Sequence, residues 1–165
     1  ENILYSMNDY DRPPREFEIP DVIFMVYCSA SCFAQLKRHR MSTIIPQSYS
    51  LKESPFIPKS FKNTILEKKL AKLSKKSFII DKQIRKDNMN IMPYTALNAT
   101  KRAVLVKMNS RELYHFVRLR SDKHAQLEIR EISDALAKEL KILFPHLYRH
   151  LSGKDAFKNS KDLSH

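Results

Sequence analysis

The chain contains one glycine, Gly153, in 165 residues. Glycine provides the positive φ angles and the close backbone approach that glycine-rich phosphate loops require. A Rossmann dinucleotide fingerprint and a Walker loop each contain several glycines, so the sequence excludes both. Any nucleotide ligand must therefore be held in another way.

The composition points to a folded protein with an anionic ligand or partner. Hydrophobic residues make up 42% of the chain, which predicts a real core in a single domain spanning 1–165. The formal net charge of +12 attracts anions. No run of about 18 apolar residues occurs, so we predict no transmembrane helix. The first residues do not resemble a signal peptide.

Cysteine usage indicates a reducing compartment. Cys28 and Cys32 are too few for a disulfide framework or a four-ligand zinc site. We therefore expect both to be core residues, with no metal site, and we expect a cytoplasmic location.

Hydrophobic spacing predicts a strand followed by a helix in the first third of the chain. An apolar, β-branched run predicts a strand over 22–27. A helix over 32–40 is expected to follow, capped by Ser29 or Ser31. We interpret 1–16 as an extended lead-in and 44–50 as a loop, which Pro46 interrupts.

The region 52–90 is predicted to form a basic helical hairpin, with one helix over 61–76. Eleven Lys or Arg residues stand against four Asp or Glu residues between 51 and 90. This charge either forms a solvated face or makes a basic wall that attracts phosphorylated or polyanionic ligands. A nucleic-acid-binding module is a further alternative, although no aromatic residues are interleaved with the charges.

A second strand is predicted over 101–108, followed by a helix that starts at Ser110 and can continue to 144. Asn109 can cap this helix, with Glu112 completing a capping box. Arg120 lies on the apolar stripe of the predicted helix, where a buried guanidinium needs a partner or a ligand. The lysine-rich tail over 153–165 is expected to fray.

Arg38-His39-Arg40 is followed after seven residues by Ser48. On the predicted helix, Gln35, Arg38 and His39 share the face opposite Phe33 and Leu36. The run is either a solvated basic helix end or a site for phosphate or carboxylate oxygens, which suit planar guanidiniums.

Arg-His-Arg, seven residues and then Ser is a pattern that resembles the flavin-dependent thymidylate synthases (ThyX). A second block also resembles that family: Asn109-x-Arg111 at a helix start, then Leu119-Arg120 and His124-Ala125-Gln126. We call these the first and second motifs. Phe17-Glu18 is similar to the family's Phe-Glu ahead of its first strand.

The resemblance implies roles for particular residues. Arg120 and Ser48 would be catalytic, because a fixed guanidinium stabilises the negative charge that develops on uracil oxygens. The substrate dUMP would be bound by Gln35, Arg38, Ser48 and Arg120. FAD would be contacted by Glu18, Arg38, His39, Arg40, Asn109, Arg111 and His115.

The resemblance also implies a fold and an activity. The expected fold is α+β, with a small, largely antiparallel sheet packed with long helices. The implied reaction is reductive methylation of dUMP to dTMP, with FAD, NADPH and methylenetetrahydrofolate, in a homotetramer with intersubunit sites. The alternative is a catalytically impaired relative, such as half of a tandem protein, with a flavin-binding or structural role.

The chain departs from the family pattern where phosphate and flavin are bound. Pro46 stands where the family has a Glu, and Ser50 stands where it has a phosphate-binding Arg. Another phosphate-binding Arg is expected near 92–95, where none occurs, and Pro13 replaces a flavin-contacting His. A lysine nearby would not reproduce a bidentate arginine.

Overall fold

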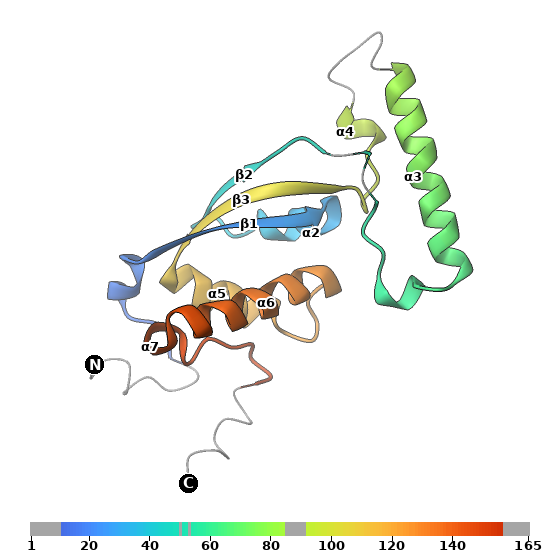
Figure 1. The fold of residues 1–165 in the computed structure, drawn as a ribbon. Coiled ribbons are helices and arrows are strands. Elements are labelled where there is room, and N and C mark those ends of the chain that lie inside the picture. The colour runs from blue at the N-terminus through green and yellow to red at the C-terminus, as the bar shows by residue number, and fades with distance from the viewer. Residues whose placement is uncertain (1–10, 50, 53, 85–91, 157–165) are drawn as a thin grey trace. The chain divides into compact units, whose positions relative to one another are not determined.

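The computed structural model describes residues 11–49, 51–52, 54–84 and 92–156, and Figure 1 shows their elements. In chain order these are η1 (Arg15–Glu18), β1 (Asp21–Ser29), α2 (Ala30–Leu36), β2 (Thr43–Pro46), η2 (Lys59–Phe61), α3 (Ile65–Ile84), α4 (Met92–Thr95), β3 (Lys101–Asn109), α5 (Ser110–Arg120), α6 (Leu127–Leu143) and α7 (Pro145–Tyr148).

The three strands form one sheet in the order β1-β3-β2. At one end the Ser110 amide donates to the Pro20 carbonyl, and at the other the Ala30 amide donates to the Thr100 carbonyl. Residues late in β1 therefore lie opposite residues early in β3, so these two strands are antiparallel. The predicted α+β fold with a small, largely antiparallel sheet is confirmed.

Alternation along the strands produces one buried face and one exposed face. On β3, Val104 and Val106 are fully buried, while Leu105 between them is exposed. On β1, Val26 and Cys28 are buried in the same way. Full burial of each valine contributes on the order of 1.5–3 kcal/mol, so this face anchors the sheet to the core.

The prediction of a loop over 44–50 is wrong at its start, where β2 forms an edge strand. The Gln47 amide donates to the Ala103 carbonyl at 2.9 Å, which continues the pairing with β3 beyond Pro46. Proline cannot donate to a ladder, and an edge position tolerates this because one side of the strand needs no partner.

Contacts divide the chain into two compact units. The first unit comprises Glu1–Ile23, His39–Thr43 and Lys107–His165, and the second comprises Phe24–Arg38 and Ile44–Val106. The single domain over 1–165 stays a prediction.

In the first unit, the helix expected over 110–144 is two helices, which corrects the sequence prediction. α5 and α6 pack on each other and are separated by the turn at 121–126. The Gln126 side chain accepts from the Ile129 amide and so caps the N-terminus of α6. This N-cap favours a new helix over continuation of the old one.

The lone glycine lies where the chain crosses the end of α5. A Cβ atom on Gly153 would lie 2.7 Å from the Ser121 carbonyl oxygen, closer than real Cβ contacts. Gly153 is buried. The predicted fraying of 153–165 is therefore not seen at 153, and residues 157–165 lie outside the described part of the chain.

In the second unit, Ser29 caps α2 by accepting from the Cys32 amide at 3.1 Å. Ser29, and not Ser31, is therefore the N-cap of α2. Cys28 and Cys32 are both buried, as predicted.

The expected extended lead-in over 1–16, which belongs to the first unit, is partly outside the described residues. Its last two residues already belong to η1.

The helix predicted over 61–76 begins and ends later, as α3. Its start is set by Thr64, whose hydroxyl accepts from the Leu66 amide, and by Glu67, whose carboxylate accepts from the Asn63 amide at 2.6 Å. The sequence Thr-x-x-Glu is a capping signal that the apolar spacing overlooked. Within the described part of 52–90, α3 is the one α-helix, so the predicted hairpin has no second arm there.

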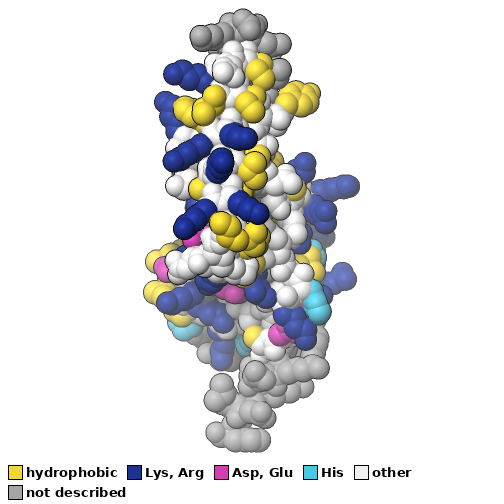
Figure 2. All heavy atoms as spheres, turned by 90° about the vertical axis from the view of Figure 1, so that its right-hand side faces the viewer, with side chains coloured by type: hydrophobic (Ala, Val, Ile, Leu, Met, Phe, Trp, Pro, Cys, Tyr) yellow, Lys and Arg dark blue, Asp and Glu magenta, His cyan; other side chains and the backbone are white. Residues whose placement is uncertain are grey.

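Lysines and aliphatic side chains share the outward surface of α3, as Figure 2 shows. Leu66, Leu73 and Ile80 are about half exposed at seven-residue intervals. Both acidic residues of the helix are engaged: the Glu67 carboxylate accepts from the Asn63 amide, and Asp81 accepts from the Thr95 hydroxyl.

No helix in the described residues is long and apolar enough to span a membrane.

Candidate functional site

The run 38–40 does not lie on a helix, which corrects the predicted helix over 32–40. α2 ends at Leu36 because the chain tightens there: the Arg38 amide donates to the Gln35 carbonyl, three residues back. The expected helical face that carries these side chains is therefore absent. Arg38 and Arg40 are exposed, and His39 is buried.

His39 connects the two motifs inside the first unit. Its Nδ1 lies 2.8 Å from Glu112 Oε1, and Arg120 Nε donates to its Nε2 at 3.0 Å. An arginine can only donate, so Nε2 carries the lone pair and Nδ1–H donates to the carboxylate. His39 is therefore a neutral imidazole in one tautomer. Both ring nitrogens are used within the protein.

Aromatic neighbours fix the plane of this imidazole. The His39 ring lies edge-on to Phe116, with 5.0 Å between centroids, and 5.9 Å from the ring of His115. Phe116 is fully buried on α5, one helical turn from Glu112 and Arg120. The three polar groups are thus held by packing as well as by hydrogen bonds.

The start of α5 presents the second motif. Asn109 accepts from the Glu112 amide at 2.8 Å, so the predicted N-cap is confirmed. The predicted capping box is incomplete, because the Glu112 carboxylate turns to His39. Arg111 forms an ion pair with Glu18 of η1, and both are part-exposed. Two residues that the resemblance assigns to FAD, Arg111 and Glu18, therefore contact each other.

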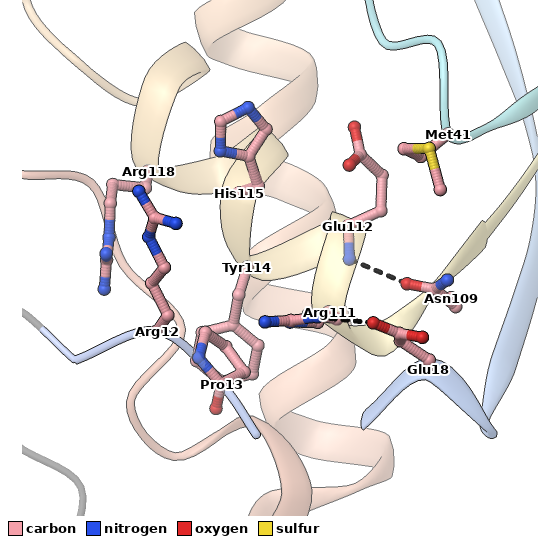
Figure 3. A pocket seen from close by; sticks show the side chains of 10 residues that line it. All are labelled: Arg12, Pro13, Glu18, Met41, Asn109, Arg111, Glu112, Tyr114, His115 and Arg118. Atoms are coloured by element: carbon pink, nitrogen blue, oxygen red, sulfur yellow. Dashed lines mark hydrogen bonds and ion pairs between the residues drawn. The ribbon is translucent and has the colours of Figure 1, made fainter. Parts of the chain in front are cut away.

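A cavity of about 430 Å³ lies beside the N-terminal turns of α5 in the first unit (Figure 3). The side chains of Arg111 and Arg118 come from α5, and that of Arg12 comes from the segment before η1. The lining includes two carboxylates and three guanidiniums, so its formal charge is positive. The lining residues are Arg12, Pro13, Glu18, Met41, Asn109, Arg111, Glu112, Tyr114, His115 and Arg118.

Tyr114 adds no charge to this cavity. Burial raises its pKa well above the ordinary 10.0, which outweighs the lowering by a backbone hydrogen bond to His150. The phenol donates to the Leu147 carbonyl at 2.8 Å. A neutral, donating tyrosine leaves the guanidiniums as the dominant electrostatic feature of the lining.

Sequence reasoning missed Arg12 and Arg118. Arg118 follows Arg111 by seven residues, two helical turns, so helical spacing from Arg111 and His115 would have placed it on the same face. It also donates to the Asp11 carbonyl at 3.0 Å. Arg12 belongs to the irregular segment before η1, and no periodic pattern indicates where such a side chain points.

The remaining predicted substrate residues belong to the second unit. Gln35 is half-buried on α2, and Arg38 is exposed in the following turn. Ser48 is exposed just after β2. Of the departures from the family pattern, Pro46 ends β2 and Pro13 lines the cavity, while Ser50 lies outside the described residues.

The fold is α+β, and the cavity beside α5 has a net positive lining. Residues 3–146 match the family model described as thymidylate synthase complementing protein. The chain belongs to this family.

Several curated relatives carry the name flavin-dependent thymidylate synthase. The protein of Thermococcus onnurineus is 32% identical over 121 residues, which cover 64% of this chain and 48% of the relative. That of Pyrococcus furiosus is 31% identical over 131 residues, with 68% and 51% covered. That of Thermococcus kodakarensis is 33% identical over 128 residues, with 68% and 51% covered. The chain spans about half the length of these relatives.

Proposed function

We propose that this chain takes part in flavin-dependent thymidylate synthesis, the reductive methylation of dUMP to dTMP. The co-substrates would be methylenetetrahydrofolate and NADPH, and the site would act in a homotetramer in the cytoplasm. Family membership supports the reaction class. The observation that carries the proposal is the hydrogen-bonded chain Glu112–His39–Arg120, which joins the two motifs characteristic of the family.

The cavity on α5 fits an FAD phosphate group chemically. Its three guanidiniums and the Asn109 side chain suit an anion, and its volume is in the range of small-molecule sites. Arg111 would exchange Glu18 for a phosphate oxygen, because it already holds a carboxylate there. We propose that Arg111, Asn109, His115 and Arg118 hold FAD, with Arg12 beside them.

Arg120 is proposed to bind the uracil of dUMP. His39 fixes the Nε end of its guanidinium, and Glu112 fixes His39 in turn. A guanidinium held in this way stabilises negative charge on the uracil oxygens without reorganising. Gln35, Arg38 and Ser48 are proposed to bind the same nucleotide. FAD, when bound, supplies the redox chemistry, so neither cysteine is needed as a nucleophile.

A catalytically impaired relative is the second candidate function. It is favoured by the absence of an arginine in α4, Met92–Thr95, and by Pro46 at the end of β2. The chain would then keep flavin binding or a structural role without turnover.

One experiment separates these candidates. Purified protein is mixed with FAD and examined by absorbance and flavin fluorescence, then titrated with dUMP and assayed for dTMP. We expect flavin binding that Arg111→Met weakens about 10-fold or more, as for a lost hydrogen bond to a charged group. Arg130→Met is the matched control, because Arg130 donates to the Lys123 carbonyl and does not line the cavity.

The outcomes are distinct. Flavin and dUMP binding with dTMP formation supports the synthase. Flavin binding without turnover supports the impaired relative. A folded protein that binds neither flavin nor dUMP contradicts both.

A further inference from the structure

The outer face of α3 carries aliphatic side chains that alternate with lysines (Figure 2). The helix belongs to the second unit, where it packs on α4 and η2. Five aliphatic residues of α3 are nevertheless each between 43% and 64% exposed. They are Ile65, Leu66, Leu73, Ile79 and Ile80. A helix face that meets only water normally carries polar residues at such positions.

The exposed charge on α3 has one sign. Six lysines of the helix are exposed, whereas its two acidic residues bind groups of the protein. The Glu67 carboxylate accepts from the Asn63 amide, and the buried Asp81 accepts from the Thr95 hydroxyl. The exposed lysines are Lys68, Lys69, Lys72, Lys75, Lys76 and Lys82. A surface with this charge attracts an anionic partner.

Comparison with α6 shows that this balance is particular to α3. α6 also has exposed aliphatic residues, Ile142 and Leu143, and an exposed lysine, Lys138. Its exposed positions include the carboxylates of Asp134 and Glu139 as well. Exposed lysines and aliphatic residues therefore occur on both helices, but only on α3 are they free of carboxylates between them.

The spread of the aliphatic side chains on α3 distinguishes among anionic partners. At 100° per residue, the five residues cover an arc of about 140° around the helix axis, with lysines between them. One partner helix would cover a narrower seam. A nucleic acid would gain from aromatic side chains rather than from aliphatic ones. The surface of an anionic lipid bilayer accepts both groups, because aliphatic side chains enter the acyl boundary while lysines extend to the headgroups.

We propose that the outer face of α3 is a docking surface for membranes that contain anionic lipids. The helix lies along the bilayer surface and does not cross it. The exposed aliphatic residues supply the apolar contact, and the exposed lysines supply the attraction to the headgroups. The inference does not depend on the proposed function, because the residues that line the cavity beside α5 all lie outside α3.

The test measures co-sedimentation with vesicles of phosphatidylcholine alone and of equal parts phosphatidylcholine and phosphatidylserine. We expect much stronger binding to the mixed vesicles, and added salt should weaken it. Lys69→Gln/Lys76→Gln should lower the affinity roughly 30-fold, from about 5-fold for each lysine at an anionic surface. The control Lys138→Gln/Lys154→Gln removes the same charge from exposed positions of the first unit and should bind like the wild type.

A second pair of variants tests the aliphatic contact. Ile65→Ser/Ile79→Ser keeps the charge of α3 and should weaken binding to the mixed vesicles about 10-fold or more, because fewer apolar groups enter the acyl boundary. Its binding to duplex DNA should stay at the wild-type level. Ile142→Ser/Leu143→Ser is the matched control on α6, and its vesicle binding should equal that of the wild type.

A folded wild type that does not bind the mixed vesicles overturns the proposal. Equal vesicle binding by Ile65→Ser/Ile79→Ser also overturns it, because charge alone would then explain the attraction, as it would for a nucleic acid. Self-association that this variant abolishes in light scattering would show that a second copy covers the face, and the proposal would fail. If circular dichroism shows that the variant does not fold, Ile79→Ser and Leu73→Ser replace it, and each must weaken vesicle binding.

Discussion

The two compact units hold their cationic groups in opposite ways. In the first, the Arg120 guanidinium donates to His39, and His39 in turn is hydrogen-bonded to the buried carboxylate of Glu112. In the second, Arg102 rests on aromatic rings, and the lysines of α3 cover an exposed surface (Figure 2). Groups of the first kind should determine whether the chain folds. Groups of the second kind should be removable at little cost in stability.

The sharpest test of this contrast replaces His39 with alanine. Glu112 and Arg120 then lose their shared partner inside the protein, and breaking such a buried arrangement costs roughly 3–5 kcal/mol. Chemical denaturation of His39→Ala should show a loss of this size. The adjacent exposed cation gives the control, because Arg40→Ala should change the free energy of unfolding by less than about 0.5 kcal/mol. Similar losses of unfolding free energy in His39→Ala and Arg40→Ala would contradict the contrast between buried, hydrogen-bonded groups and exposed ones.

A second large effect is expected at the lone glycine. The added methyl of Gly153→Ala meets the Ser121 carbonyl at 2.7 Å, and backbone must shift to admit it. Overpacking of this kind costs about 1–3 kcal/mol, to be measured as a lower free energy of unfolding. Lys154→Ala, on the neighbouring exposed residue, serves as the control. A Gly153→Ala protein as stable as the wild type would show that this crossing is loosely packed.

Alkaline pH should weaken the first unit. Burial raises the pKa of both Tyr114 and Tyr148 above the ordinary 10.0, so the folded state keeps their protons where the unfolded chain loses them. Their contribution is complete below about pH 10 and is lost as the pH rises further, by up to about 1.4 kcal/mol per pH unit for each tyrosine. Tyr114→Phe should flatten this decline between pH 10 and 11. An unchanged slope in that variant would refute the assignment.

The smallest effect is expected on α3. Replacing Lys69 and Lys76 with glutamine should change stability by less than about 0.5 kcal/mol, because both side chains are exposed. Retention on a polyanion column should fall in proportion to the lost charge, while dUMP binding stays constant. A drop in dUMP affinity would bring α3 into the substrate site.

Periodic segments were predictable from the sequence, and the ends of elements were not. A short apolar, β-branched run located β1, and apolar alternation located β3, where the buried Val104 follows the pattern. The break between α5 and α6 depends on a side-chain cap at Gln126, which competes with a continuous helical pattern. Local hydrogen bonds decided this boundary, and hydrophobic spacing does not record them.

The candidate site shows the same division. Motif spacing brought out His39 and Arg120, but it placed them on separate helical faces rather than in contact. Their contact spans 81 residues of sequence, a separation that no local pattern encodes. Arg12, which lines the cavity, was overlooked because it lies in the irregular segment before η1, where no periodic pattern places a side chain.

The outward face of β1 bears on the colloidal behaviour of the protein. Ile23 and Met25 are each 65% exposed, and Tyr27 is 43% exposed, on an edge strand of nine residues. Apolar side chains beside an edge are sites of self-association at high concentration. We therefore expect self-association through β1 to limit the solubility of the protein despite its net charge of +12. Met25→Lys should raise the solubility more than an added charge on α3.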